Sequence, residues 1–208
     1  MAYGIVGPQN PAVLVLRQLE KWIYQKANEV IFPFDGAYDY IVEQGWEKDI
    51  PRSKIHYINN GVDLEAFDLN QESFVVEDSD LENPGICKVV YVGSIRRVNN
   101  LGLLLDAAKR ITDPAVKFLI WGDGDEREAL EHRIQAEKIS NVVFKGKVEK
   151  KYIPSIVRRA DINLIHGGDC GKALFRFGIS PNKMFDCLAA GKPIIMDLPA
   201  RYNPVEQF

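Results

Sequence analysis

Residues 88–124 are KVVYVGSIRRVNNLGLLLDAAKRITDPAVKFLIWGDG, and this stretch decides the fold. It begins with the apolar run 89–93, which is typical of a strand buried on both faces. Residues 101–111 then carry apolar side chains at helical spacing, and a second apolar strand is predicted over 116–121. A strand, a helix and a second strand of these lengths predict a β-α-β unit with parallel strands.

The same alternation continues toward the C-terminus. Helices are predicted over 126–138, 153–159 and 182–190, and strands over 141–147, 162–165 and 193–197. The sequence therefore predicts an α/β fold with a Rossmann-like parallel sheet over residues 87–208.

Residues 1–64 carry shorter elements. Pro11 suits the first turn of a helix, and apolar residues at helical spacing continue from Val13 to Ala27. Short strands are expected at 29–32 and 54–58.

Residues 65–86 form an acidic segment that ends in Asn83-Pro84-Gly85. We expect a solvated connector between the two parts of the chain, although Phe74, Val75 and Val76 could instead dock on a domain.

Composition narrows the class of protein. The chain has 208 residues and a net charge of -3, and it lacks the basic footprint that nucleic-acid binding usually leaves. Three cysteines without a C-x-x-C pair argue against a disulfide framework or a zinc site. No apolar run is long enough to span a bilayer, and no signal peptide is visible. We expect a cytoplasmic protein without a metal.

Ligands of open parallel sheets bind beyond the carboxyl ends of the strands. The candidate binding residues that follow strands here are Gly93, Ser94, Arg96, Arg97, Lys147, Val148 and His166. Lys172 and Arg176 are further candidates for the same cleft. Glycines also end strands for purely structural reasons, so the set is more informative than any single member. The segment Gly122–Arg127 lacks the third glycine of a dinucleotide fingerprint.

The strongest local signal is GISPNKMFD at residues 178–186. Ser180 suits the N-cap of a helix and Pro181 its first position. The free amides and positive dipole end of such a helix favour an anion, most often phosphate, and Lys183 adds a charge. Asp186 is placed to accept hydrogen bonds from a sugar. The candidate binding residues here are Gly178, Ile179, Ser180, Pro181, Asn182, Lys183 and Asp186.

A purely structural interpretation of this segment stays open. In that interpretation Ser180 and Pro181 only begin the helix, and Lys183 pairs with Asp186 three residues later.

Four passages together resemble GT-B glycosyltransferases of the retaining family-4 type. They are INNGVD at 58–63 with Phe67, VYVGS at 90–94, LIWGDG at 119–124 and GISPNKMFDCLAAGKPI at 178–194. The last passage is the most specific, and it is similar to the branch that builds bacterial surface polysaccharides such as capsule or O-antigen. The resemblance implies that 1–64 end an N-terminal, acceptor-side domain and that 65–86 connect the domains. Residues 87–208 would then be an incomplete donor-nucleotide-binding domain.

The resemblance also implies an activity. A sugar would pass from a nucleotide-sugar donor to a saccharide or lipid-linked acceptor, with retained anomeric configuration and without a cofactor. Asp186 would contact the ribose, 180–183 the diphosphate, and Lys147 and Val148 the base. Lipid-linked acceptors lie at the inner membrane face, so the helix from Val13 to Ala27 is a candidate for peripheral membrane contact, although packing on the rest of its own domain is favoured. Because a GT-B enzyme needs two such domains, we expect the chain alone to be inactive.

Some family positions differ here. Of the two glutamates of the family's E-x7-E pattern, the first falls on Gly178 and the second on Asp186. The family's Arg and Lys after the first strand fall on Ser94 and Asn99. Other cations must then face the diphosphate, and the candidates are Arg96, Arg97, Lys183 and Arg176. Two alternatives stay open: a GT-B-fold sugar-nucleotide epimerase, and a non-catalytic nucleotide- or protein-binding module.

Overall fold

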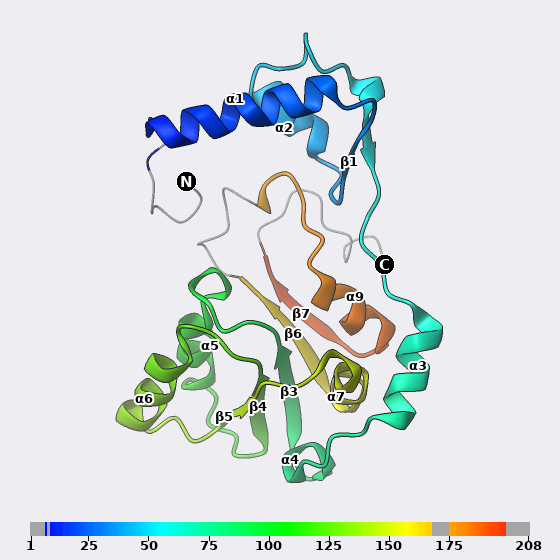
Figure 1. The fold of residues 1–208 in the computed structure, drawn as a ribbon. Helices are drawn as coiled ribbons and strands as arrows, with labels where there is room; N and C mark the ends of the chain where they lie inside the picture. Colours follow the sequence, from blue (N-terminus) through cyan, green and yellow to red (C-terminus); the bar gives the residue numbers. More distant parts are fainter. Residues whose placement is uncertain (1–6, 8, 168–174, 199–208) are drawn as a thin grey trace. The chain divides into compact units, whose positions relative to one another are not determined.

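The computed structural model describes residues 7, 9–167 and 175–198. They form two compact units (Figure 1). The first unit contains the described residues up to Asn60 together with 175–180, and the second contains 61–167 and 181–198.

The second unit is built around a parallel sheet of five strands in the order β5-β4-β3-β6-β7. The strands are β3 (Cys87–Val92), β4 (Val116–Trp121), β5 (Val142–Gly146), β6 (Ile162–His166) and β7 (Ile194–Asp197). Every neighbouring pair is parallel, and the chain winds outward from β3 in both directions. This order is the doubly wound arrangement of Rossmann-like domains, so the predicted fold class is confirmed.

Helices cover both faces of this sheet (Figure 1). They are α3 (Leu64–Ser73), α4 (Ser79–Glu82), α5 (Leu101–Ala108), α6 (Arg127–Glu137), α7 (Ile153–Arg159) and α9 (Asn182–Ala189), with short 3-10 turns η2 (Arg97–Asn99) and η3 (Lys150–Tyr152). Successive side chains of β3 point to opposite faces. Val89 and Tyr91 therefore pack with α5 and α6, whereas Val90 packs with Leu81 of α4 and Ile156 of α7.

The first unit has a smaller core. Its elements are α1 (Pro11–Lys26), β1 (Val30–Phe32), α2 (Ala37–Glu43), η1 (Arg52–Lys54) and β2 (Ile55–Tyr57). β1 and β2 pair in parallel, and the buried residues are Phe32, Ala37, Ile41, Trp46 and Ile50. Glu20 ties α1 to this core, because its carboxylate accepts hydrogen bonds from the hydroxyls of Tyr24 at 3.0 Å and Tyr40 at 2.8 Å.

Helix α1 turns its apolar face outward. Its inward side carries Val13 and the hydrogen-bonded Glu20 and Tyr24. The exposed apolar side chains at helical spacing are Val15, Leu16, Leu19, Trp22 and Ile23, and we call this set the α1 stripe. Val15 is 67% exposed and Leu16 63%. The described residues of the first unit therefore leave most of the helix's apolar surface uncovered.

The segment predicted as a solvated connector is instead folded onto the second unit. It forms α3 and α4, and Phe67 of α3 and Leu81 of α4 are buried. The prediction of solvation was wrong because apolar residues of the segment are buried and two of its acidic residues, Asp78 and Asp80, pair with lysines in the sheet.

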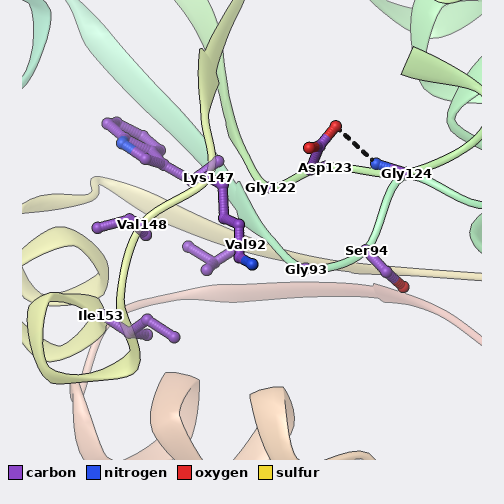
Figure 2. A pocket seen from close by; sticks show the side chains of 10 residues that line it. Val92, Gly93, Ser94, Gly122, Asp123, Gly124, Lys147, Val148 and Ile153 are labelled. Atoms are coloured by element: carbon purple, nitrogen blue, oxygen red, sulfur yellow. Dashed lines mark hydrogen bonds between the residues drawn. The ribbon is translucent and has the colours of Figure 1, made fainter.

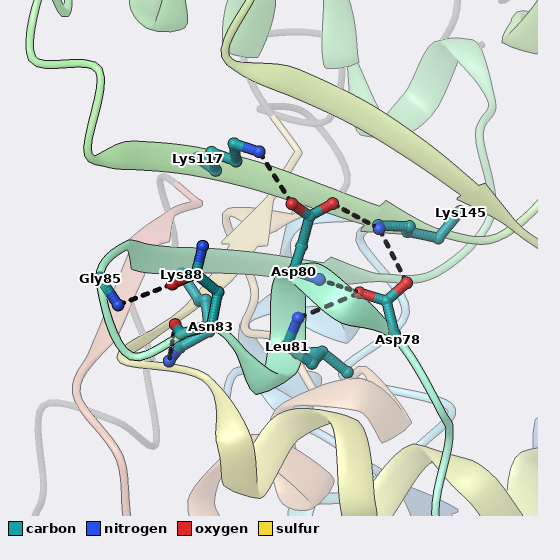
Figure 3. A network of polar contacts seen from close by, with 8 residues as sticks. All are labelled: Asp78, Asp80, Leu81, Asn83, Gly85, Lys88, Lys117 and Lys145. Carbon is teal, nitrogen blue, oxygen red and sulfur yellow. Dashed lines mark hydrogen bonds and ion pairs between the residues drawn. The ribbon is translucent and has the colours of Figure 1, made fainter.

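Figure 3 shows these partners. Asp80 forms ion pairs with Lys117 of β4 at 2.8 Å and Lys145 of β5 at 2.6 Å, and Asp78 meets Lys145 at 2.7 Å. Asp78 also caps α4 by accepting the backbone N–H groups of Asp80 and Leu81. Hydrogen bonds from the two lysines hold the pKa of Asp80 below its ordinary value.

Asp80→Asn removes two ion pairs from this partly buried network. We expect the free energy of unfolding at neutral pH to fall by about 1–3 kcal/mol, measured by urea denaturation. Because the folded-state pKa of Asp80 is lowered, its contribution is present above the unfolded-state pKa and is lost as the pH falls through the folded-state value. The difference between wild type and variant should therefore shrink in acid. Asp68→Asn, at an exposed position of α3, is the control. Equal effects of the two substitutions would contradict the role of the network.

Candidate functional site

A pocket of about 350 Å³ opens at the carboxyl ends of β3, β4 and β5 (Figure 2). It is lined by Val92, Gly93, Ser94, Trp121, Gly122, Asp123, Gly124, Lys147, Val148 and Ile153. All of these residues belong to the second unit. The pocket lies where ligands of open parallel sheets bind, and it contains Gly93, Ser94, Lys147 and Val148 from the residues that the sequence suggested.

Two strand-end loops form the floor of this pocket. Beyond the ends of β3 and β4, the N–H of Gly93 donates to the carbonyl of Trp121 at 3.0 Å, and the N–H of Ile95 donates to Asp123 at 2.9 Å. A Cβ atom built on Gly122 would lie 1.8 Å from the carbonyl oxygen of Gly93. A Cβ on Gly124 would lie 2.2 Å from the carbonyl oxygen of Ile95. Both glycines are therefore needed for the close approach of the two loops.

The sequence argument did not select several lining residues as binding residues. Gly122 and Gly124 were noted after the second strand and within a family passage, and they fail the dinucleotide fingerprint, but they were not selected as binding residues. Their signal was present, since a glycine pair follows directly after an apolar strand at the ligand edge. Ile153 and Val92 gave no comparable signal, because apolar residues in helices and strands are indistinguishable from core residues in the sequence.

Lys183 lies in the first turn of α9 and points toward the end of β3. Its ammonium donates to the hydroxyl of Tyr91 at 3.2 Å and to Oδ1 of Asn99 at 3.3 Å, and it lies 4.6 Å from the centroid of the Tyr91 ring. Within the described residues it has no carboxylate partner, so the alternative pairing with Asp186 is not formed. Burial lowers the pKa of Lys183 to about 8, and the neighbouring Cys187 opposes this change. An ammonium held in this way is suited to an anionic ligand.

Hydrogen bonds connect Lys183 to the pocket through two residues. Asn99 donates from Nδ2 to the carbonyl of Ser94 at 2.7 Å and to its hydroxyl at 2.9 Å. Tyr91 donates its hydroxyl to the same carbonyl at 2.9 Å. The Ser94 end of the pocket is therefore one side chain away from the Lys183 ammonium. Burial raises the pKa of Tyr91, so its hydroxyl stays a donor at physiological pH.

Arg96 and Arg97 belong to the same loop as Ser94. Both side chains are exposed, and neither forms an ion pair within the part of the chain that the structure describes. They do not line the pocket. They remain candidates for contact with the outer part of a bound anion.

The start of α9 differs from the predicted cap. Pro181 is the N-cap, with extended backbone, and no side chain accepts the first amides of the helix. Ser180 belongs to the first unit, where its hydroxyl accepts the backbone N–H of Asn60 at 3.1 Å and donates to Oδ1 of Asn59. The prediction of Ser180 as N-cap was wrong because this tertiary contact takes its side chain. The amides at the start of α9, beside the exposed Asn182, are left without a side-chain cap.

His166 is buried and already engaged. Its Nε2 atom donates to the carbonyl of Asn100 at 2.8 Å, and Nδ1 lies 2.9 Å from a carboxylate oxygen of Asp197. Asn100 precedes α5 in a left-handed conformation with a φ of 44°. The imidazole therefore ties the start of α5 to the end of β7, and neither ring nitrogen is left for a ligand.

The remaining candidates lie on either side of Ser180. Arg176, in the first unit, pairs with Glu43 and lies 4.7 Å from the centroid of the Phe177 ring. Gly178 has a φ of 124°, which L side chains rarely adopt, and Ile179 is buried. In the second unit, burial raises the pKa of Asp186, while Lys150 acts in the opposite direction. Lys172 lies outside the described residues.

Two further results concern the described residues alone. They contain no cluster of His, Cys, Asp and Glu side chains that could hold a metal ion. None of their helices has the length and apolar character needed to cross a bilayer.

Comparison with known proteins identifies relatives. Residues 87–198 match the family model described as glycosyl transferases group 1. Over 182 residues the chain is 24% identical to a protein of Bacillus subtilis (strain 168) described as a teichuronic acid biosynthesis glycosyltransferase, TuaH. That alignment covers 87% of this chain and 43% of TuaH, so the chain spans less than half of that relative.

Solved structures share the fold. HepE of Anabaena, crystallised with UDP, has a TM-score of 0.67 at 16% identity, covering 99% of this chain and 53% of HepE. A HepE structure with UDP-glucose gives the same TM-score. The sucrose-phosphate synthase of Thermosynechococcus elongatus has a TM-score of 0.65 at 20% identity, covering 93% of this chain and 46% of that enzyme.

Gly122→Ala should disrupt the floor of the pocket. The added methyl group would overlap the Gly93 carbonyl, so the two loops must separate, at a cost of about 2–4 kcal/mol in unfolding free energy. Gly61→Ala is the matched control, because its Cβ would meet nothing within 4 Å. Thermal denaturation of both variants measures the difference. If Gly122→Ala and Gly61→Ala melt at the same temperature, the two loops do not need this close approach.

Proposed function

This chain belongs to the group 1 glycosyl transferases, and from that premise we propose that its second unit binds the nucleotide-sugar donor of a glycosyltransferase. A UDP-sugar is the first donor class to test, because HepE, which shares the fold, was crystallised with UDP and with UDP-glucose. The observation that carries the proposal is the pocket at the sheet edge, with Lys183 one side chain beyond its polar end.

The two ends of the pocket differ in chemistry. Val92, Trp121, Val148 and Ile153 provide apolar walls, which suit a planar nucleobase. At the other end, Ser94 leads to Asn99 and the Lys183 ammonium. A diphosphate at this end would meet the Lys183 ammonium, which has no carboxylate partner within the described residues. The uncapped amides at the start of α9 add donors for the same anion.

This arrangement accounts for what the protein contributes to sugar transfer. When the bond between sugar and diphosphate breaks, negative charge develops on the leaving phosphate. A fixed ammonium and helix N–H groups stabilise that charge without having to reorganise. Asp186, partly buried near Lys150, is the residue that we propose accepts hydrogen bonds from the ribose.

The finer parts of the proposal concern the whole protein. They are retention of anomeric configuration, a saccharide or lipid-linked acceptor, assembly of a cell-surface polysaccharide, and a cytoplasmic location. The description of TuaH as a teichuronic acid biosynthesis glycosyltransferase supports a surface polysaccharide. Capsule and O-antigen are two other polymers of this class.

We also propose that the first unit is the end of an acceptor-side domain. A pair of parallel strands is too small to stand alone, since parallel sheets are covered on both faces. The α1 stripe is the surface that the rest of such a domain would cover. Sedimentation with anionic phospholipid vesicles tests the membrane as an alternative occupant. Retention by vesicles that is abolished by Trp22→Lys would favour the membrane over the domain.

Donor binding can be measured with this chain itself. In a thermal-shift screen against UDP-, GDP- and ADP-sugars, one base should raise the melting temperature by several degrees, because a ligand that binds only the folded state stabilises it. If no donor stabilises the chain, the proposal fails for this chain, and a protein-binding module becomes the better interpretation.

Lys183 gives the binding reaction a characteristic pH dependence. Because its pKa is lowered to about 8, the free protein loses this charge above that pH. We expect the affinity for UDP to fall about tenfold between roughly pH 7 and pH 9. Lys183→Arg, which stays charged, should keep its affinity over this range, and Lys183→Met should bind weakly at both pH values. Isothermal titration calorimetry provides the measurement, and a wild-type affinity that does not change with pH would exclude Lys183 as the phosphate cation.

A further inference from the structure

Two uncharged residues hold the Lys183 ammonium. The hydroxyl of Tyr91, in β3, accepts a hydrogen bond from it at 3.2 Å, and Oδ1 of Asn99, in η2, accepts another at 3.3 Å. The Tyr91 ring also faces it, with 4.6 Å between Nζ and the ring centroid. An ammonium group has three N–H donors. Two of them are used here, and no partner of the third lies among the described residues.

Hydrogen bonds to Ser94 fix what each of these residues offers to Lys183. The single hydroxyl proton of Tyr91 goes to the Ser94 carbonyl at 2.9 Å, so only oxygen lone pairs are left for the ammonium. The Nδ2 group of Asn99 donates to the carbonyl of Ser94 at 2.7 Å and to its hydroxyl at 2.9 Å. The reversed amide would set its NH2 group against the ammonium and its oxygen against the carbonyl. The network therefore requires that Oδ1 faces Lys183.

Uncharged acceptors suit a cation that has to bind an anion. A carboxylate partner would stabilise the ammonium more strongly, but it would also compensate the charge and repel a phosphate. The amide oxygen of Asn99 and the ring and hydroxyl of Tyr91 stabilise the charge without compensating it. Tyr91 is 1% exposed, so its hydroxyl cannot leave this position without disturbing the core.

Resting on the proposed function, we propose that Tyr91 and Asn99 are positioning residues, which hold the Lys183 ammonium charged and leave its third N–H for the donor diphosphate. Neither residue has to touch the donor. Both oppose the effect of burial, which favours the neutral amine. Of the titratable groups near Lys183, Tyr91 faces it from β3 and Cys187 acts on it from α9. Burial raises the pKa of the Cys187 thiol to about 12 and also raises the pKa of Tyr91, so both groups are neutral at physiological pH.

Two substitutions should move the titration of Lys183 in opposite directions. Tyr91→Phe keeps the ring but removes an acceptor from the charged form, so the ammonium should lose its proton about one pH unit lower than in wild type. Asn99→Asp sets a carboxylate against the ammonium, so it should keep its proton to a pH about one unit higher. A general loss of packing would not produce opposite changes.

The titration is measured on the free protein by NMR, from the ε-carbon signal of Lys183 in isotope-labelled chain, assigned with Lys183→Arg. Isothermal titration calorimetry then gives the affinity for UDP over roughly pH 6.5 to pH 9. With Tyr91→Phe, the fall in affinity should begin about one pH unit lower. Asn99→Asp should weaken UDP binding about tenfold at neutral pH, because the charge is compensated.

Tyr152→Phe is the matched control. The Tyr152 ring contacts Phe74 and Lys151, and it does not line the pocket. This variant should keep both the titration of Lys183 and the affinity for UDP at the wild-type values.

Three results overturn the inference. If Lys183 titrates alike in wild type, Tyr91→Phe and Asn99→Asp, the two residues do not hold the ammonium. If the titration shifts while the pH dependence of UDP binding stays unchanged, the ammonium does not serve the diphosphate, although donor binding persists. If wild type does not bind UDP, GDP or ADP, the proposed function fails and the inference fails with it. Should Tyr91→Phe not fold, Asn99→Asp alone decides between these results.

Discussion

Burial of the central strand β3 on both faces is the constraint on which the second unit depends. Its alternating side chains enter two separate clusters, with Val89 and Tyr91 on one side and Val90 on the other. A strand in this position cannot slip by one residue, because every side chain would move to the wrong face. The register of β3 therefore fixes where the strand ends, and with it the position of the loop that begins at Gly93.

Tyr91 links this packing to the site. Its ring is part of the core, while its hydroxyl reaches the end of the strand, donates to Ser94 and accepts from Lys183. Holding a lysine among these groups without a carboxylate partner is unfavourable, which is why its pKa falls to about 8. The same placement makes the ammonium more effective toward an anion, since little water competes for it. The burial that lowers the pKa of Lys183 in the free protein is therefore the same feature that would strengthen its attraction to a bound anion.

The sequence was most informative where local pattern and tertiary structure agree. The apolar runs of the second unit became strands within one or two residues of the predicted ends, because a parallel strand buried on both faces needs a continuous apolar run. The pocket lies at the edge of the sheet where the sequence predicts ligand binding, because strand direction fixes which ends carry the loops. The tertiary partners of polar side chains were harder to predict. Asp78 and Asp80 were interpreted as solvated, yet their lysine partners stand more than thirty residues away in β4 and β5.

The prediction that Ser180 caps a helix was wrong for the same reason. A serine before a proline predicts a helix cap from local rules, but the Ser180 side chain bonds to Asn59 and Asn60, 121 and 120 residues earlier in the chain. A polar side chain does not form the contact that local rules predict where a distant residue satisfies its hydrogen bonds better. A single sequence does not show which distant residues are available. His166 is a further case, because its position after a buried strand suggests a ligand contact, whereas both of its nitrogens brace neighbouring segments.

The backbone conformation explains why this chain departs from the family pattern at one position. Gly178 stands where the resemblance places the first glutamate, and its φ of 124° is a conformation that side chains disfavour. A glutamate could not simply be restored there, because the local chain would have to change its path. A second departure concerns the loop after β3, where the resemblance places cations at positions that are Ser94 and Asn99 in this chain. Asn99 accepts a hydrogen bond from Lys183, so in the proposed site α9 would supply the cation that the family pattern places on the loop. Such a relocation would keep a positive charge beside the diphosphate of the proposed donor, although the loop is uncharged at Ser94 and Asn99.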